Sequence, residues 1–179
     1  MKKPIIDFYL GEGTNIAGEK LDDILRWNNG QLEMDHDYIQ WMFPSNEPSN
    51  INCDAPVLDK ETADLFRADP ELKEMLRASF IRILDFFGFW YNERYTCGFP
   101  EPTVEPLVPT EKRPHPRKCL EFFNHNMFRV TRVLKSLRLC GLEEEAMAFF
   151  EALKMFKDSS GVTLNSWGHW ERAANDPLW

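Results

Sequence analysis

Apolar residues recur along most of the chain at the three- and four-residue spacing of a helix with one buried face. The longest such run follows Asp69-Pro70-Glu71, which supplies a capping side chain, a proline at the first helical position and an acid in the first turn. Gly88 then stops the helix. We predict that this helix is the central core element, with inward residues Leu72, Met75, Leu76, Phe80, Ile83, Leu84 and Phe87.

Shorter segments on both sides of that helix show the same period. Asp35 suits the N-cap of a helix that runs through Met42 and ends before Pro44, because the residue before a proline avoids the helical region. Asp59 can cap the next helix, and Gly141 is a typical left-handed stop. Residues 8–10 are expected in an irregular N-terminal segment whose two aromatic rings dock on the body. Further helices are expected from Leu21, near Asn124, from Leu142 to about Ser159, and from about Asn165.

The pattern fails between Asn92 and Arg117, where six prolines fall and neither the helical nor the strand period is present. We predict a long Pro-rich loop over about residues 90–118, which either packs across the surface in a polyproline-like form or acts as a lid. No segment shows the alternation of a strand, and we find no internal repeat. The expected fold class is all-α: a single domain over residues 1–179, built as an irregular helical bundle.

Composition and charge narrow the possible functions. The chain has 179 residues, of which 43% are hydrophobic and 13% aromatic, which is typical of a globular protein. A net charge of −8 repels phosphates and anionic lipids, so we expect no non-specific nucleic-acid binding and no membrane binding. The first residues lack the apolar run of a signal peptide, and no window approaches the ~20 apolar residues of a membrane span, so we expect a cytoplasmic protein. Because Cys53, Cys97, Cys119 and Cys140 show no CxxC or CxxH spacing, we expect no structural zinc site. The chain's size and the lack of a secretory signature predict reduced thiols, and we expect no metal and no cofactor.

A basic stripe on one expected helix is the best candidate for chemistry. Arg129 and Arg132 are neighbours on a helix, and His125 lies one turn earlier on the same face. Two guanidiniums one turn apart fit a carboxylate or a phosphate, and Asn126 adds a polar group near the free N–H donors of the helix start. Lys135 flanks the stripe. These five residues are candidate anion ligands; the alternative is that the arginines form structural ion pairs with acidic neighbours.

A second candidate cluster is His36, Tyr38, Gln40 and Trp41. His36 has no metal-binding partner three or four residues later, so it is either a hydrogen-bonded structural histidine or a ligand contact. The rings of Trp41 and Phe43 belong either to the core or to a platform on which an aromatic ligand stacks.

Both clusters resemble the conserved region of opioid growth factor receptors, a family that also includes short stand-alone bacterial proteins. The first block is Tyr38-Ile39-Gln40-Trp41 with Phe43-Pro44 and Glu47-Pro48. The second is His125-Asn126 followed by Arg129-Val130-Thr131-Arg132, Leu134-Lys135-Ser136-Leu137 and Gly141-Leu142. The resemblance spans about Phe8 to Phe156, although the loop after Gly88 looks longer than the family's. It implies a receptor-like or opioid-peptide-binding label associated with an enkephalin ligand, and it implies no catalytic residues.

These observations favour a non-enzymatic binding module that recognises a peptide or another anionic ligand through the Arg-bearing helix, in a pocket between residues 36–42 and 125–137. The chain contains no GxSxG elbow, P-loop, GxGxxG or HExxH motif. One alternative is an enzyme for a phosphorylated or nucleotide substrate with His125 or His36 as acid or base, which requires both to reach one cavity. Another is a protein-interaction domain that uses the Pro-rich loop or the aromatic side chains of Trp167, Trp170 and Trp179.

Overall fold

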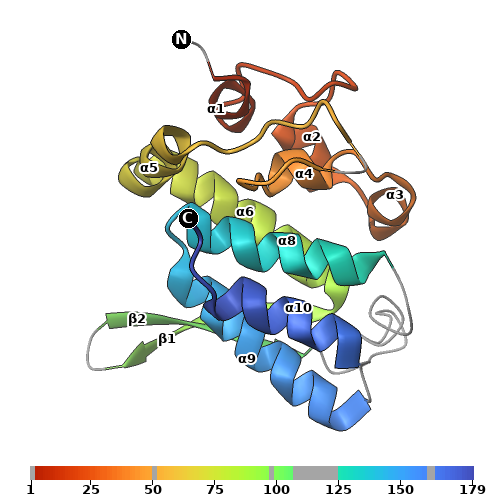
Figure 1. The fold of residues 1–179 in the computed structure, drawn as a ribbon, viewed down its shortest axis with the longest axis vertical. Helices are drawn as coiled ribbons and strands as arrows, with labels where there is room; N and C mark the ends of the chain where they lie inside the picture. The colour runs from red at the N-terminus through yellow and green to blue at the C-terminus, as the bar shows by residue number, and fades with distance from the viewer. Residues whose placement is uncertain (1–2, 50–51, 97–98, 107–124, 161–163) are drawn as a thin grey trace.

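The computed structural model describes residues 3–49, 52–96, 99–106, 125–160 and 164–179. The described elements are α1 (Pro4–Tyr9), α2 (Leu21–Arg26), α3 (Asn29–Met34), α4 (Ile39–Met42), α5 (Lys60–Ala68), α6 (Pro70–Phe87), β1 (Phe89–Thr96), β2 (Phe99–Pro106), α8 (Asn126–Leu139), α9 (Glu143–Ser160) and α10 (Leu164–Asn175). Helices α8, α9 and α10 pack against one another, and α6 contacts α9 through aromatic rings. The shorter N-terminal helices cover α6 and α8 on one side, and a β-hairpin lies beside α9 (Figure 1).

The central helix α6 confirms the prediction made for it. The Asp69 side chain accepts from the backbone N–H groups of Glu71 at 2.8 Å and Leu72 at 3.4 Å, and Gly88 ends the helix with a φ of 82°. The predicted cap of α5 by Asp59 and the stop of α8 before Gly141 are also confirmed, the latter with a φ of 87°. The apolar face of α6 is buried against α1, α2, α5 and β1.

The N-terminal quarter is more helical than we expected. The predicted irregular segment around residues 8–10 is largely the helix α1, although its two aromatic rings do dock on the body: Phe8 packs edge-on against Trp41 at 5.3 Å, and the Tyr9 hydroxyl donates to the Met42 carbonyl. Asp35 does not begin a helix. It is the C-cap of α3, which the sequence reading missed, and α4 begins only at residue 39.

The all-α expectation is wrong for part of the predicted Pro-rich loop, because β1 and β2 form an antiparallel hairpin within it. Residues 107–118 of that predicted loop lie outside the described part of the chain. The prolines at positions 100, 102 and 106 fall on alternate residues, and alternate residues of an antiparallel strand point their N–H away from the partner. The hairpin pairing therefore survives prolines that made the segment look like coil. The fold is predominantly helical with a small two-stranded sheet.

Two cysteines fall in the described residues. Cys140 is a buried free thiol, and its burial raises its pKa to about 12. Cys53 is an exposed free thiol. Cys97 and Cys119 lie outside the described residues. No helix in the described ranges has the length and apolar character needed to cross a bilayer.

Candidate functional site

Most of the predicted site residues meet at the C-terminal end of α3. The last carbonyl groups of a helix lack partners within the helix and attract positive charge. Arg129, which is only 4% exposed, donates to the carbonyl oxygen of Leu32 at 2.8 Å and to that of Asp35 at 2.6 Å. Its guanidinium also lies over the ring of Tyr38, 5.3 Å from the centroid. Arg129 therefore ties α8 to the end of α3, and its donors face the protein interior.

Asn126 and Tyr38 complete this contact. The buried Asn126 side chain accepts from Arg129 at 3.1 Å and donates to Glu33 at 3.2 Å. The Tyr38 hydroxyl donates to the same Leu32 carbonyl at 3.2 Å, and burial raises the pKa of this hydroxyl. We call Tyr38, Asn126 and Arg129, with the α3 carbonyls that they contact, the α3 junction.

Gln40 and Trp41 are buried next to this junction. With its amide nitrogen turned toward the main chain, Gln40 donates to the carbonyl oxygens of His36 and Asp37, both at 3.0 Å. Trp41 is 4% exposed and packs on Phe8, and its Nε1 has no hydrogen-bond partner among the described atoms. Both side chains help to hold the turn before α4.

The rings of His36 and His125 contact each other at a tilt of 34°, with centroids 4.7 Å apart. The exposed His36 places Nδ1 3.0 Å from the carbonyl oxygen of Met34, and therefore donates there. His125 Nε2 lies 3.5 Å from a Glu33 carboxylate oxygen, within ion-pair distance but without hydrogen-bond geometry. Burial, and then the charge of Arg129, lower the pKa of His125. The two rings converge, but they line neither of the two clefts described below.

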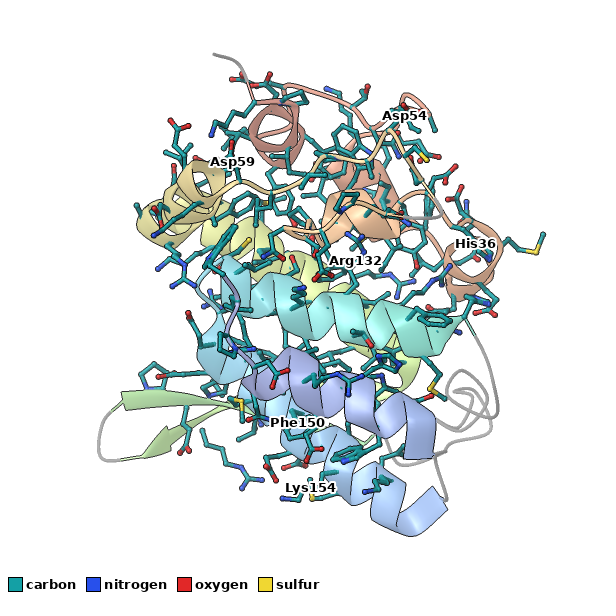
Figure 2. The ribbon with its side chains drawn as sticks, viewed as in Figure 1. His36, Asp54, Asp59, Arg132, Phe150 and Lys154 are labelled. Atoms are coloured by element: carbon teal, nitrogen blue, oxygen red, sulfur yellow. The ribbon has the colours of Figure 1, made fainter. Side chains whose placement is uncertain are left out.

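Arg132 and Lys135 extend the stripe along α8. Arg132 donates to the Phe43 carbonyl oxygen at 3.2 Å, and burial lowers the pKa of its guanidinium. Figure 2 shows Arg132 between α8 and the N-terminal helices. Lys135 pairs with Glu47 at 2.6 Å. In the described part of the chain, Arg129 and Arg132 donate to carbonyl and amide oxygens and not to carboxylates.

Lys135 also lines a cleft of about 340 Å³ between α8 and α10, on a different flank of α8 from the α3 junction. On α8 the spacing of 131, 135 and 138 places three side chains on one face. Residues 169, 172 and 173 of α10 do the same on the facing helix, and Asp176 directly follows its end. We call this the basic cleft, and its walls are Glu47, Thr131, Lys135, Arg138, His169, Arg172, Ala173, Asp176, Pro177 and Leu178.

The cations of the basic cleft differ in how firmly they are held. Arg138 donates to the carbonyl oxygens of Ala173 at 2.7 Å and Asp176 at 3.0 Å, so it caps the end of α10. Arg172 donates to Nδ1 of His169 at 3.1 Å, which requires that nitrogen to be unprotonated. In the described ranges, Lys135 has one partner, the largely exposed Glu47. An incoming anion can therefore reach the Lys135 and Arg172 side chains without breaking a buried bond.

The binding site predicted from the sequence included Lys135 but not the α10 residues that face it. The signal was present as basic residues at helical spacing in residues 169–176, yet only the packing of α10 on α8 opposes the two faces. The three tryptophans that were candidates for one interaction surface differ in their exposure and contacts. Trp170 is fully buried and donates to the Met127 carbonyl at 3.0 Å, Trp167 stacks on Phe150 at 5.1 Å, and Trp179 is 58% exposed.

Comparison with known proteins gives a consistent result. Residues 5–164 match the family described as the opioid growth factor receptor (OGFr) conserved region. The opioid growth factor receptor of Homo sapiens is 35% identical over 144 residues, which cover 78% of this chain and 20% of the human protein. The receptor of Rattus norvegicus is 35% identical over 70% of this chain and 21% of its own length. The opioid growth factor receptor-like protein 1 of Xenopus tropicalis is 30% identical over 70% of this chain and 23% of its own length.

The chain thus spans about a fifth of the length of the curated relatives that it matches. No solved structure matches it significantly.

Proposed function

The chain belongs to the family of the opioid growth factor receptor conserved region, and from this premise we propose that it is a receptor-like binding module that captures an anionic group in the basic cleft. The group is a free peptide carboxylate or a phosphate. The observation that carries this proposal is the placement of Lys135 and Arg138 of α8 opposite Arg172 of α10, in a chain of net charge −8.

The charges of the basic cleft support an anion as the ligand. Three cations line it, against the carboxylates of Glu47 and Asp176. Among the described residues, Arg172 has no carboxylate partner, so its forked N–H groups can donate to a carboxylate or phosphate in two-point contact. The Lys135 side chain is 20% exposed and its partner Glu47 is 69% exposed, so a ligand can replace the Glu47 carboxylate from the solvent side. The Arg129 side chain of the predicted site then acts by fixing α8, and Lys135 carries the ligand contact.

A thermal-unfolding titration tests the proposal. The probes are inorganic phosphate, sulfate, and one short peptide prepared with a free C-terminal carboxylate and with an amidated C-terminus. A ligand at ~100 times its dissociation constant adds about 2.7 kcal/mol to the free energy of unfolding, which is ~5–10 °C for a chain of this size. We expect a shift with the free carboxylate or with phosphate, and its loss in Lys135→Gln/Arg172→Gln.

The matched control is Arg26→Gln/Lys60→Gln, which removes the same two charges from exposed positions of α2 and α5. The proposal fails if no probe shifts the wild-type protein, or if the cleft variant and the control variant respond equally. Equal responses of the free and amidated peptides would exclude the carboxylate.

The contact between the His36 and His125 rings favours a second candidate function, an enzyme with one of them as acid or base. A nucleotide or phosphosugar would have to bind over the exposed ring of His36, next to Asn126. Perturbation of the two histidine ring NMR signals by such a compound, together with its slow conversion, would support this candidate, and unchanged ring signals would remove it.

A further inference from the structure

Strand β2 runs beside α9 (Figure 1). A second cleft, of about 560 Å³, is lined by residues of both elements and shares no residue with the basic cleft. Its volume is in the range of ordinary ligand sites. We call it the acidic groove, and its walls are Pro100, Glu101, Pro102, Glu144, Met147, Ala148 and Glu151.

The local sequence explains why a groove forms here. Alternate residues of a strand share one face, so Pro100 and Pro102 lie on the same face of β2 as the buried Val104, the face turned to α9. The proline rings are compact and do not fill the space between β2 and α9 at this end of the strand. A groove therefore remains between the strand and the helix. Across it, positions 144, 147, 148 and 151 form one face of α9. Met147, at 37% exposed, is an adaptable apolar side chain at the floor.

The charge of the groove has one sign. The walls include the carboxylates of Glu144 and Glu151 on α9 and no lysine or arginine, while Glu101 is on the opposite face of β2 from Pro100 and Pro102. Lys154 lies 3.6 Å from Glu151, with both side chains more than half exposed, and Figure 2 places Lys154 on the outer side of α9. Such a pair is weak and leaves the Glu151 carboxylate open to exchange. An apolar floor between carboxylates matches an aliphatic side chain flanked by cations.

The spacing of the carboxylates sets the shape of the occupant. Glu144 and Glu151 are seven residues apart on α9, which is about 10.5 Å along the axis. Every second residue of an extended chain faces the same side, so residues i, i+2 and i+4 can all point into the groove. At about 3.3 Å per residue, cations four positions apart are separated by about 13 Å, and their long flexible stems can close the small difference from the carboxylate spacing. We infer that the acidic groove docks an extended segment of a partner protein, in which two Lys or Arg residues four positions apart flank an aliphatic residue midway between them. This contact is independent of the basic cleft.

Fluorescence anisotropy with a labelled peptide tests the inference. The probe carries two lysines four positions apart with a leucine midway between them, and the comparison peptide carries glutamates in place of the lysines. We expect saturable binding of the lysine peptide only, weakening as salt is raised. Glu144→Gln/Glu151→Gln should weaken it at least tenfold. The control Asp64→Asn/Glu71→Gln removes the same charge from exposed positions of α5 and α6 and should change affinity less than twofold.

The methyl group of Met147 locates the contact. In protein labelled with ¹³C at methionine methyls, the signal that disappears in Met147→Leu should shift on peptide addition. The inference is overturned if the lysine peptide does not bind at low ionic strength, if both double variants bind it equally, or if Met147 does not respond. Self-association of the wild-type chain that disappears in Glu144→Gln/Glu151→Gln would assign the groove to a second copy, and would overturn a separate partner.

Discussion

Replacing Arg129 with methionine should destabilise the fold far more than the same change at its neighbours on α8. Methionine keeps much of the apolar stem and removes the donors. The carbonyl oxygen of Asp35 and the amide oxygen of Asn126 lose a partner, while Leu32 keeps the Tyr38 hydroxyl. An orphaned buried acceptor costs ~1–3 kcal/mol, so we expect Arg129→Met to lower the free energy of unfolding by about 3–4 kcal/mol.

Two neighbouring residues provide the controls. Arg132→Met removes one hydrogen bond of 3.2 Å, to Phe43, and should cost about 1 kcal/mol. Lys135→Met removes a surface ion pair with Glu47 and should cost less than about 1 kcal/mol. Urea unfolding followed by circular dichroism measures the free energy of unfolding of all three variants. The comparison holds when the variants share the same dependence of that free energy on urea concentration. Arg129→Lys should recover less than half of the loss, because one ammonium does not reproduce the fork that reaches two carbonyls.

Hydrogen exchange adds a local measurement. Because Arg129 holds the end of α3, the amides of α3 and α4 should lose protection in Arg129→Met before those of α6 do. A cost for Arg129→Met within 1 kcal/mol of that for Lys135→Met would refute the assignment of Arg129 to the fold, and would return it to the list of available anion ligands.

Three further predictions follow from single contacts. Burial and neighbouring positive charge lower the pKa of His125, so the unfolded chain binds more protons than the folded chain below pH ~6.5. The free energy of unfolding should therefore fall as the pH is lowered from about 7.5 to about 5.5. The substitution His125→Gln should make the free energy of unfolding less dependent on pH in this range. Gly141→Ala should cost about 2 kcal/mol in thermal unfolding, because the position has a φ of 87° and the new Cβ would lie 3.0 Å from Arg67 Cγ; a cost near zero would contradict this. Iodoacetamide at pH 8 should label Cys53 and leave Cys140 unmodified in the folded protein, because Cys140 is buried with a pKa of about 12; equal labelling in peptide mass spectra would contradict it.

Local signals predicted the long helices well. The caps at Asp59 and Asp69 and the glycines at 88 and 141 act within a few residues, so their effect is visible without a partner. The hairpin was missed because its pairing depends on residues up to 17 positions away and on the common direction of its proline nitrogens. The helix α3 was missed because Asp35 has the same side chain whether it begins a helix or follows one.

The sequence by itself determined the family, the predominance of helix and the presence of a basic face on α8. The sequence could not show which basic residue of α8 stabilises the fold and which can contact a ligand, since Arg129 and Lys135 lie within two turns of the same helix. Tertiary packing made the distinction: the α3 carbonyls bind Arg129, while α10 packs beside Lys135 and leaves a cleft there. Backbone carbonyls are present in every sequence and carry no residue-specific signal. Which arginine they occupy is therefore decided only when distant segments meet.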